Sequence, residues 1–116
     1  ERTGIHPVES TSEERLKYHL AAVLVCNFVN HLYTVADIWC RENLLNPDFL
    51  KPLILETAKK VQELNPPESQ TGPAKRGDTG SMEKHLALLN DHPAIRQVYT
   101  LMSEQIQNRY QYLRKP

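Results

Sequence analysis

The fold is decided by residues 11–45, which read TSEERLKYHLAAVLVCNFVNHLYTVADIWCRENLL. Thr11 followed by Glu14 is a capping box, in which the two side chains bond exposed backbone N–H groups at a helix N-terminus. No Gly or Pro follows until Pro47, just after Asn46. The pattern therefore predicts one helix that continues to about Leu45 and is roughly 50 Å long at the standard rise per residue.

This helix has an apolar face and a polar face when its residues are placed at 100° intervals. The apolar face consists of Leu24, Phe28, Leu32, Val35 and Trp39. Within an arc of roughly 80° elsewhere on the helix lie the residues that we name the polar seam: His19, Asn27, Asn30, Thr34 and Asp37. Residues 23–36 contain neither Lys nor Glu, which usually fill a solvated helix face. We therefore expect the polar seam to face other protein, a cleft, or both.

Two interpretations of the polar seam remain open. In the structural interpretation, Asn27 and Asn30 bond to a neighbouring helix and His19 is a core histidine with its hydrogen bonds satisfied. In the functional interpretation, the seam lines a crevice whose other wall is the loop at residues 71–78. Amides, an imidazole and the guanidinium of Arg76 would then meet over a ligand.

The rest of the chain predicts shorter helices. Asn46 and Pro47 open a second helix in which Pro52 kinks or restarts the first turn; its buried face comprises Leu50, Ile54, Ala58, Val61 and Leu64. Residues 81–89 read as a short helix, and Asp91-His92-Pro93 opens the last one. That helix carries an apolar stripe of Ile95, Val98, Met102, Ile106, Tyr110 and Leu113. No segment alternates with a strand period for long, so the predicted fold is all-α, with one long N-terminal helix packed against about three shorter ones.

Residues 65–80 are too rich in Gly, Pro and Ser for regular structure, and they contain the segment Gln70-Thr71-Gly72-Pro73-Ala74-Lys75-Arg76-Gly77-Asp78. Its glycines, proline and adjacent cations can bring backbone amides and a guanidinium together on one anionic group. The competing interpretation is a tight interhelical turn with ordinary surface charges. Residues 76–78 also spell an integrin-type tripeptide, a minor alternative because nothing else indicates secretion.

The charge balance argues against partners of high charge density. The chain has 116 residues, enough for one domain, with 14 Lys and Arg against 14 Asp and Glu. Nucleic acid and anionic membrane surfaces are therefore unexpected partners. The most apolar stretch, residues 20–29, is shorter than the ~20 residues of a membrane span, which predicts a core helix and no membrane.

The two cysteines predict a reducing compartment. Cys26 and Cys40 lie on one predicted helix, roughly 20 Å apart, so they cannot form a disulfide with each other. Together with the absence of a signal-peptide pattern in this sequence, they favour the cytoplasm. His6, His85 and His92 have no partner at metal-ligand spacing, so we expect no metal site.

Several spaced motifs resemble one known family. Residues 18–23 (YHLAAV) and 26–33 (CNFVNHLY), then 50–58, 70–74 with Arg76 and Asp78, 83–86 and 93–103 follow in the family's order. The chain from Ser10 onward thus resembles the helical domain that trails a Rossmann-like domain in a family named for NADP-dependent oxidoreductases.

The resemblance implies a fold similar to the C-terminal domain of 6-phosphogluconate dehydrogenase, in which such domains commonly mediate dimerisation and contribute to a substrate cleft. It implies that residues 1–10 are a linker from a missing N-terminal Rossmann-like domain and that residues 11–116 are a dimerisation and substrate domain. NADP is then the cofactor of the full-length protein, while this chain, which lacks GxGxxG, binds none.

The candidate substrate contacts are His19 and Asn27 as hydrogen-bonding groups, Thr71 and the amides around Gly72 as donors, and Arg76 for a carboxylate or phosphate. Asp78 is expected either to fix Arg76 or to cap the helix that follows. No residue has a defined catalytic role, and the chain alone should be an inert piece of an oxidoreductase acting on a small molecule. The alternative is a free-standing helical module that binds another protein. A Rossmann fingerprint upstream of Glu1, or a natural start near it, would separate the two.

Overall fold

The structure is a computed structural model that describes residues 11–111. These residues form helices and turns without any β-strand, which confirms the predicted all-α class. The chain divides into two compact units, residues 1–48 and 49–116, and each unit is described by itself. The predicted linker at residues 1–10 lies outside the described residues, as does Leu113 of the predicted C-terminal stripe.

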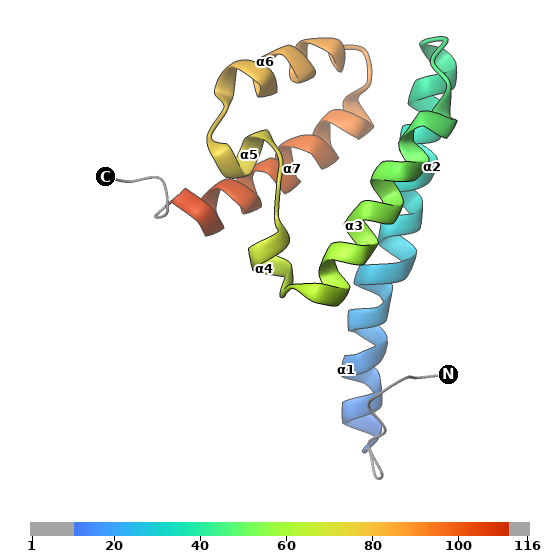
Figure 1. Cartoon of the computed structure of the whole chain (residues 1–116), viewed down its shortest axis with the longest axis vertical. Helices are drawn as coiled ribbons and strands as arrows, with labels where there is room; N and C mark the ends of the chain where they lie inside the picture. Colours follow the sequence, from blue (N-terminus) through green and yellow to red (C-terminus); the bar gives the residue numbers. More distant parts are fainter. Residues whose placement is uncertain (1–10, 112–116) are drawn as a thin grey trace. The chain divides into compact units, whose positions relative to one another are not determined.

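The first unit is built on one continuous helical segment, Ser12–Glu42, in three parts: α1 (Ser12–Ala22), η1 (Val23–Asn27) and α2 (Phe28–Glu42) (Figure 1). The capping box forms as predicted, because the Glu14 amide donates to Thr11 Oγ1 over 3.0 Å and the Thr11 amide donates to Glu14 Oε1 over 3.1 Å. The segment stops slightly before the predicted Leu45. Leu44 has a left-handed φ of 60°, a conformation that ends a helix.

The middle of this segment, η1, is π-helical. The amide of Phe28 donates to the carbonyl of Val23, five residues back, and the amide of Val23 is shared between the carbonyls of His19 and Leu20. A π-helical turn takes up about one residue more than an α-helical turn, which rotates everything downstream by about 100°. The sequence-based placement of side chains assumed an uninterrupted α-helix and is therefore wrong across η1.

The apolar side chains of the first unit are mostly exposed. In the described part of this unit, Cys40 is the hydrophobic residue that is buried, whereas Leu16, Leu20 and Phe28 are 69%, 61% and 57% exposed. The segment was predicted to be a core helix, and this exposure contradicts that prediction. By length and composition alone it could also span a membrane, a property that core helices of soluble proteins share.

The second predicted helix begins as a 3₁₀ turn, η2 (Pro47–Leu50), and continues as α3 (Lys51–Glu63). Pro52 occupies the first turn of α3, where its missing N–H group costs no intrahelical bond. Asn46 Oδ1 accepts a hydrogen bond of 2.9 Å from the Asp48 amide and so holds the entry to the 3₁₀ turn. The predicted restart at Pro52 is confirmed.

The segment predicted to be irregular contains two one-turn helices, α4 (Pro66–Ser69) and α5 (Pro73–Arg76). A proline in the first turn of each favours a helical start, so the expectation of an unstructured loop is wrong in part. α6 (Thr79–Leu88) and α7 (Pro93–Tyr110) follow and are joined by a short turn (Figure 1). α5 contacts both α6 and α7, and the buried apolar residues here are Ala74, Met82, Leu89 and Tyr110.

Candidate functional site

The loop that contains the candidate residues is shaped by two glycines. Gly72 precedes α5 with a φ of 105°, and Gly77 ends α5 with a φ of 72°. The Gly77 amide donates to the Ala74 carbonyl over 3.3 Å, and the Asp78 amide donates to the Pro73 carbonyl over 2.9 Å. Both glycines adopt conformations that L side chains rarely take. The loop is therefore a defined turn whose path depends on these positions.

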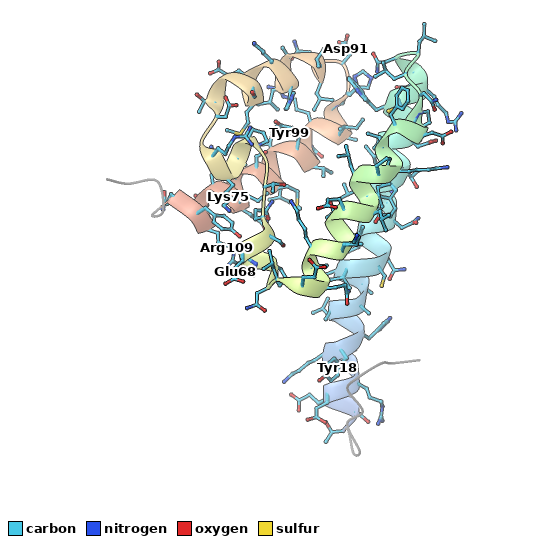
Figure 2. All side chains as sticks on the ribbon, in the orientation of Figure 1. Tyr18, Glu68, Lys75, Asp91, Tyr99 and Arg109 are labelled. Carbon is cyan, nitrogen blue, oxygen red and sulfur yellow. The ribbon has the colours of Figure 1, made fainter. Side chains whose placement is uncertain are left out.

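Lys75 braces this loop rather than facing outward for a ligand. Its Nζ donates to the Gln70 carbonyl over 3.0 Å and lies 5.3 Å from the centre of the Tyr110 ring on α7. Figure 2 labels Lys75 among the side chains of the chain. The Tyr110 hydroxyl in turn donates to the Pro67 carbonyl over 2.7 Å. These contacts link the chain before α5 to the end of α7. Of the two adjacent cations in the motif, Lys75 is thus structural.

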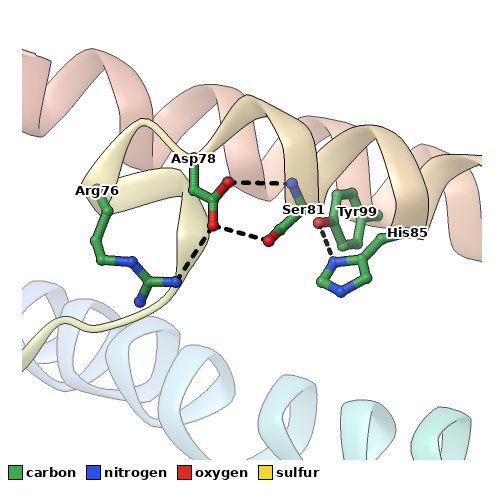
Figure 3. A network of polar contacts seen from close by, with 5 residues as sticks. All are labelled: Arg76, Asp78, Ser81, His85 and Tyr99. Atoms are coloured by element: carbon green, nitrogen blue, oxygen red, sulfur yellow. Dashed lines mark hydrogen bonds and ion pairs between the residues drawn. The ribbon is translucent and has the colours of Figure 1, made fainter.

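Arg76 is the cation that remains accessible. Its side chain is 62% exposed, and Nη2 lies 3.7 Å from Asp78 Oδ2, too far for a strong hydrogen bond (Figure 3). Thr71 is also exposed, and its carbonyl accepts a 3.0 Å hydrogen bond from Gln70 Nε2. A guanidinium held this loosely can form a bidentate contact with a carboxylate or phosphate.

Asp78 caps α6. Its Oδ1 accepts from the Ser81 amide over 3.1 Å, and its Oδ2 accepts from the Ser81 hydroxyl over 2.7 Å. These two hydrogen bonds, aided by the nearby charge of Arg76, lower the pKa of the Asp78 carboxyl below its ordinary value. The sequence predicted that Asp78 either fixes Arg76 or caps the next helix. The structure shows the cap directly, together with a weak ion pair to Arg76.

A hydroxyl–imidazole pair lies on α6 and α7, and sequence reasoning missed it. The Tyr99 hydroxyl lies 2.7 Å from His85 Nδ1, and the two rings meet edge to face with centroids 5.6 Å apart (Figure 3). Burial, and then the negative charge of Asp78, raise the pKa of the Tyr99 phenol. The hydroxyl of a neutral Tyr99 can donate a hydrogen bond to an unprotonated Nδ1 of His85, so the pair can link α6 and α7 through the hydroxyl proton.

His19 and Asn27 lie on the other unit, at α1 and in η1. Both are exposed, so the interpretation of His19 as a core histidine is wrong. Two other residues of the polar seam are engaged on their own helix: the Thr34 hydroxyl donates to the Asn30 carbonyl over 3.3 Å, and Asp37 pairs with Arg41 over 2.9 Å. The seam residues that stay available for a ligand are therefore those near η1.

The structure brings Thr71, Gly72 and Arg76 together in one turn, and His19 and Asn27 together on one helical segment. A crevice lined by both sets remains a prediction. Within residues 11–111, no three His, Cys, Asp or Glu side chains are placed to hold a metal ion.

Comparison with known proteins identifies the family. Residues 1–106 match the model of the family described as "Domain of unknown function (DUF2520)", and the chain belongs to that family. The crystal structure of the putative NADP oxidoreductase BF3122 from Bacteroides fragilis is 46% identical, with a TM-score of 0.83 over 86% of this chain. No protein with a curated description matches. The family resemblance predicted from the sequence is confirmed.

The chain spans 39% of the length of the Bacteroides fragilis protein. Its described part has no strand, and hence no strand–turn–helix unit of the kind that holds a dinucleotide pyrophosphate. Residues 11–111 thus form no Rossmann-type dinucleotide site.

Proposed function

We propose that this chain is the C-terminal helical domain of an NADP-dependent oxidoreductase, where it supplies the dimer interface and part of the substrate site. The supporting observation is the 46% identity, over 86% of the chain, to the Bacteroides fragilis protein described as a putative NADP oxidoreductase. The all-α chain would follow a Rossmann-like domain that binds the cofactor. By itself the chain would be inert, because hydride transfer is the chemistry of the cofactor.

The substrate in this proposal is a small molecule with an anionic group. Arg76 is the group best suited to bind it, because its side chain is 62% exposed and its ion pair with Asp78 is long. Backbone amides near Thr71 and Gly72 would add donors, and His19 and Asn27 would contribute an imidazole and an amide. The protein would act in the cytoplasm, in keeping with free cysteines at both Cys positions.

The rival proposal is a free-standing module that binds a partner protein through its exposed apolar side chains, such as Leu16 and Phe28. The upstream gene sequence distinguishes the two. A glycine-rich dinucleotide fingerprint ahead of Glu1 supports the oxidoreductase, whereas a natural start codon near Glu1 supports the module.

Calorimetry with NADPH tests the cofactor part of the proposal. The full-length protein should bind NADPH, and residues 1–116 alone should give no binding heat, because the phosphate-binding turn would lie in the other domain. A dissociation constant in the low micromolar range for residues 1–116 would show that the cofactor site has been misplaced.

A further inference from the structure

The exposed imidazole of His85 is held by one of its two ring nitrogens. Nδ1 lies 2.7 Å from the Tyr99 hydroxyl, and the edge-to-face contact between the two rings orients the imidazole plane. Within residues 11–111, Nε2 of His85 has no hydrogen-bond partner. A histidine that is oriented through one nitrogen in this way presents its other nitrogen to a ligand.

Tyr99 decides which nitrogen of His85 carries the proton. Tyr99 is half-buried, and burial together with the charge of Asp78 raises the pKa of its phenol, which keeps the hydroxyl protonated. A half-buried O–H group needs an acceptor, and among the described residues that acceptor is Nδ1. The neutral imidazole is therefore protonated at Nε2, so its exposed edge is a hydrogen-bond donor.

His85 shares a face of α6 with the residues that hold Arg76 (Figure 3). Asp78 accepts two hydrogen bonds from Ser81 at the start of α6, and its carboxylate lies 3.7 Å from the Arg76 guanidinium. His85 follows two helical turns after Asp78, a spacing that returns to the same helix face about 10 Å further along. This face therefore carries a guanidinium at one end and the Nε2–H donor of His85 at the other.

We propose that Arg76 and His85 together bind one elongated small anion. Arg76 binds its carboxylate or phosphate, and Nε2 of His85 donates to an oxygen at the other end of the molecule, with Tyr99 as the positioning residue of His85. This proposal names the substrate class of the proposed function and rests on it for the location of the site. It places a second substrate contact in the same compact unit as Arg76.

The separation of the two donors and the charge between them restrict the ligand. With a hydrogen bond at each end, a dicarboxylate of five carbons spans roughly 10 Å, whereas a single phosphate is too short to reach both donors. The carboxylate of Asp78 lies between the donors and repels negative charge near the middle of the ligand (Figure 3). The expected ligand is therefore neutral at its centre, anionic at the Arg76 end, and carries an acceptor oxygen at the His85 end.

Glutarate, a dicarboxylate of this length, and inorganic phosphate are the probes, and calorimetry on the full-length protein at about pH 8 measures their binding. Arg76→Gln should raise the dissociation constants of both probes by about fivefold or more. His85→Ala should do so for glutarate only, and should change that of phosphate by less than about twofold. His85→Gln keeps an N–H group near the position of Nε2 and should restore most of the glutarate affinity. The matched control His31→Ala removes an exposed histidine of the other unit and should change neither constant.

Tyr99→Phe tests the positioning role, because it keeps the ring and removes the hydroxyl. NMR of the histidine ring nitrogens at about pH 8 should show His85 in the Nε2–H form in the wild-type protein and in a mixture of both tautomers in the variant. The dissociation constant of glutarate should rise by at least about threefold, and that of phosphate should not change. Unchanged glutarate affinity would mean that Tyr99 only ties α6 to α7.

The proposal is overturned if the wild-type protein does not bind glutarate at millimolar concentrations, if His85→Ala leaves glutarate binding unchanged, or if the neutral imidazole of His85 is protonated at Nδ1. NADPH binding by the full-length protein is measured separately. If NADPH binds and any of these results is found, this site fails and the proposed function stands. If NADPH does not bind while glutarate binding depends on both Arg76 and His85, the proposed function fails instead.

Discussion

The hydroxyl of Tyr110 donates a 2.7 Å hydrogen bond to the backbone carbonyl of Pro67, 43 residues earlier in the chain. Tyr110 is only 5% exposed, and its ring also lies beside the ammonium group of Lys75. The contact ties α4 and the loop after it to the C-terminal end of α7. It therefore helps to hold the candidate loop in place. The two residues are too far apart in the sequence for local patterns to predict this contact.

Tyr110→Phe should lower the free energy of unfolding by about 1 kcal/mol, because it deletes one partly buried hydrogen bond and keeps the ring. Urea unfolding measures this. The control is Tyr18→Phe, whose side chain is exposed on α1 and which should change stability very little. Equal stability of Tyr110→Phe and wild type would show that the bond to Pro67 contributes nothing.

Gly72→Ala and Gly80→Ala should act in opposite directions. An added Cβ at Gly72 would meet nothing within 4 Å, but the φ of 105° is strained for alanine, so we expect a loss of about 1 to 2 kcal/mol. Gly80 is in α6, where its Cβ would contact Asp78 at an ordinary 3.8 Å. Gly80→Ala should gain up to about 1 kcal/mol from helix propensity. Thermal unfolding of both variants tests this prediction. A Gly72→Ala variant that is more stable than wild type would contradict the loop conformation.

Asp78 should make the chain less stable in acid. Its pKa is lowered in the folded state by the hydrogen bonds from Ser81, so its stabilisation is complete above the ordinary carboxyl pKa and is lost as the pH falls through the folded-state value. Asp78→Ala should lower the melting temperature by a few degrees at pH 7. Asp78→Asn keeps a capping oxygen, so its melting temperature should fall by less than that of Asp78→Ala.

The difference in melting temperature between wild type and Asp78→Ala should shrink as the pH falls below about 4. Scanning calorimetry between pH 7 and pH 3 follows this difference. A difference that stays constant over that range would mean that the carboxylate charge contributes nothing to the cap.

Arg76→Lys in the full-length protein should weaken the binding of an anionic substrate by one to two orders of magnitude. Lysine keeps the charge but loses the planar fork of a bidentate contact, which corresponds to about 1.5 to 3 kcal/mol. The melting temperature should hardly change, because the Arg76 side chain is 62% exposed and its ion pair is long.

Arg109 is another exposed arginine in the same unit, so Arg109→Lys is the matched control. It should change neither the substrate affinity nor the melting temperature. If Arg76→Lys instead lowers the melting temperature by several degrees while substrate binding survives, Arg76 is a brace for the loop. Its assignment to the substrate site would then be wrong.

Local patterns in the sequence predicted the helices well. The capping box at Thr11, the restart at Pro52 and the helix that opens at Pro93 depend on neighbours within one or two turns, and all three are present. The π turn at residues 23–27 was missed because residue periodicity assumes uniform α-helical geometry. The predicted apolar face accordingly began at Leu24 and did not include Leu16 and Leu20.

The candidate site was predicted less completely than the helices. The turn around Gly72 followed from its glycines and proline, and the role of Asp78 as a cap was foreseen. The pair of His85 and Tyr99 was not, since its partners are 14 residues apart on different helices. The bracing role of Lys75 was not predicted for the same reason: its ring partner, Tyr110, is brought beside it only by folding.

The central proposal is that this chain forms part of the substrate site of an NADP-dependent oxidoreductase, and a structure of the full-length protein with bound NADPH tests it most directly. We predict that the nicotinamide ring borders a cavity lined by residues from the candidate set, which comprises His19, Asn27, Thr71, Gly72 and Arg76. If all five residues lie away from that cavity, the assignment of the substrate site to this chain is wrong.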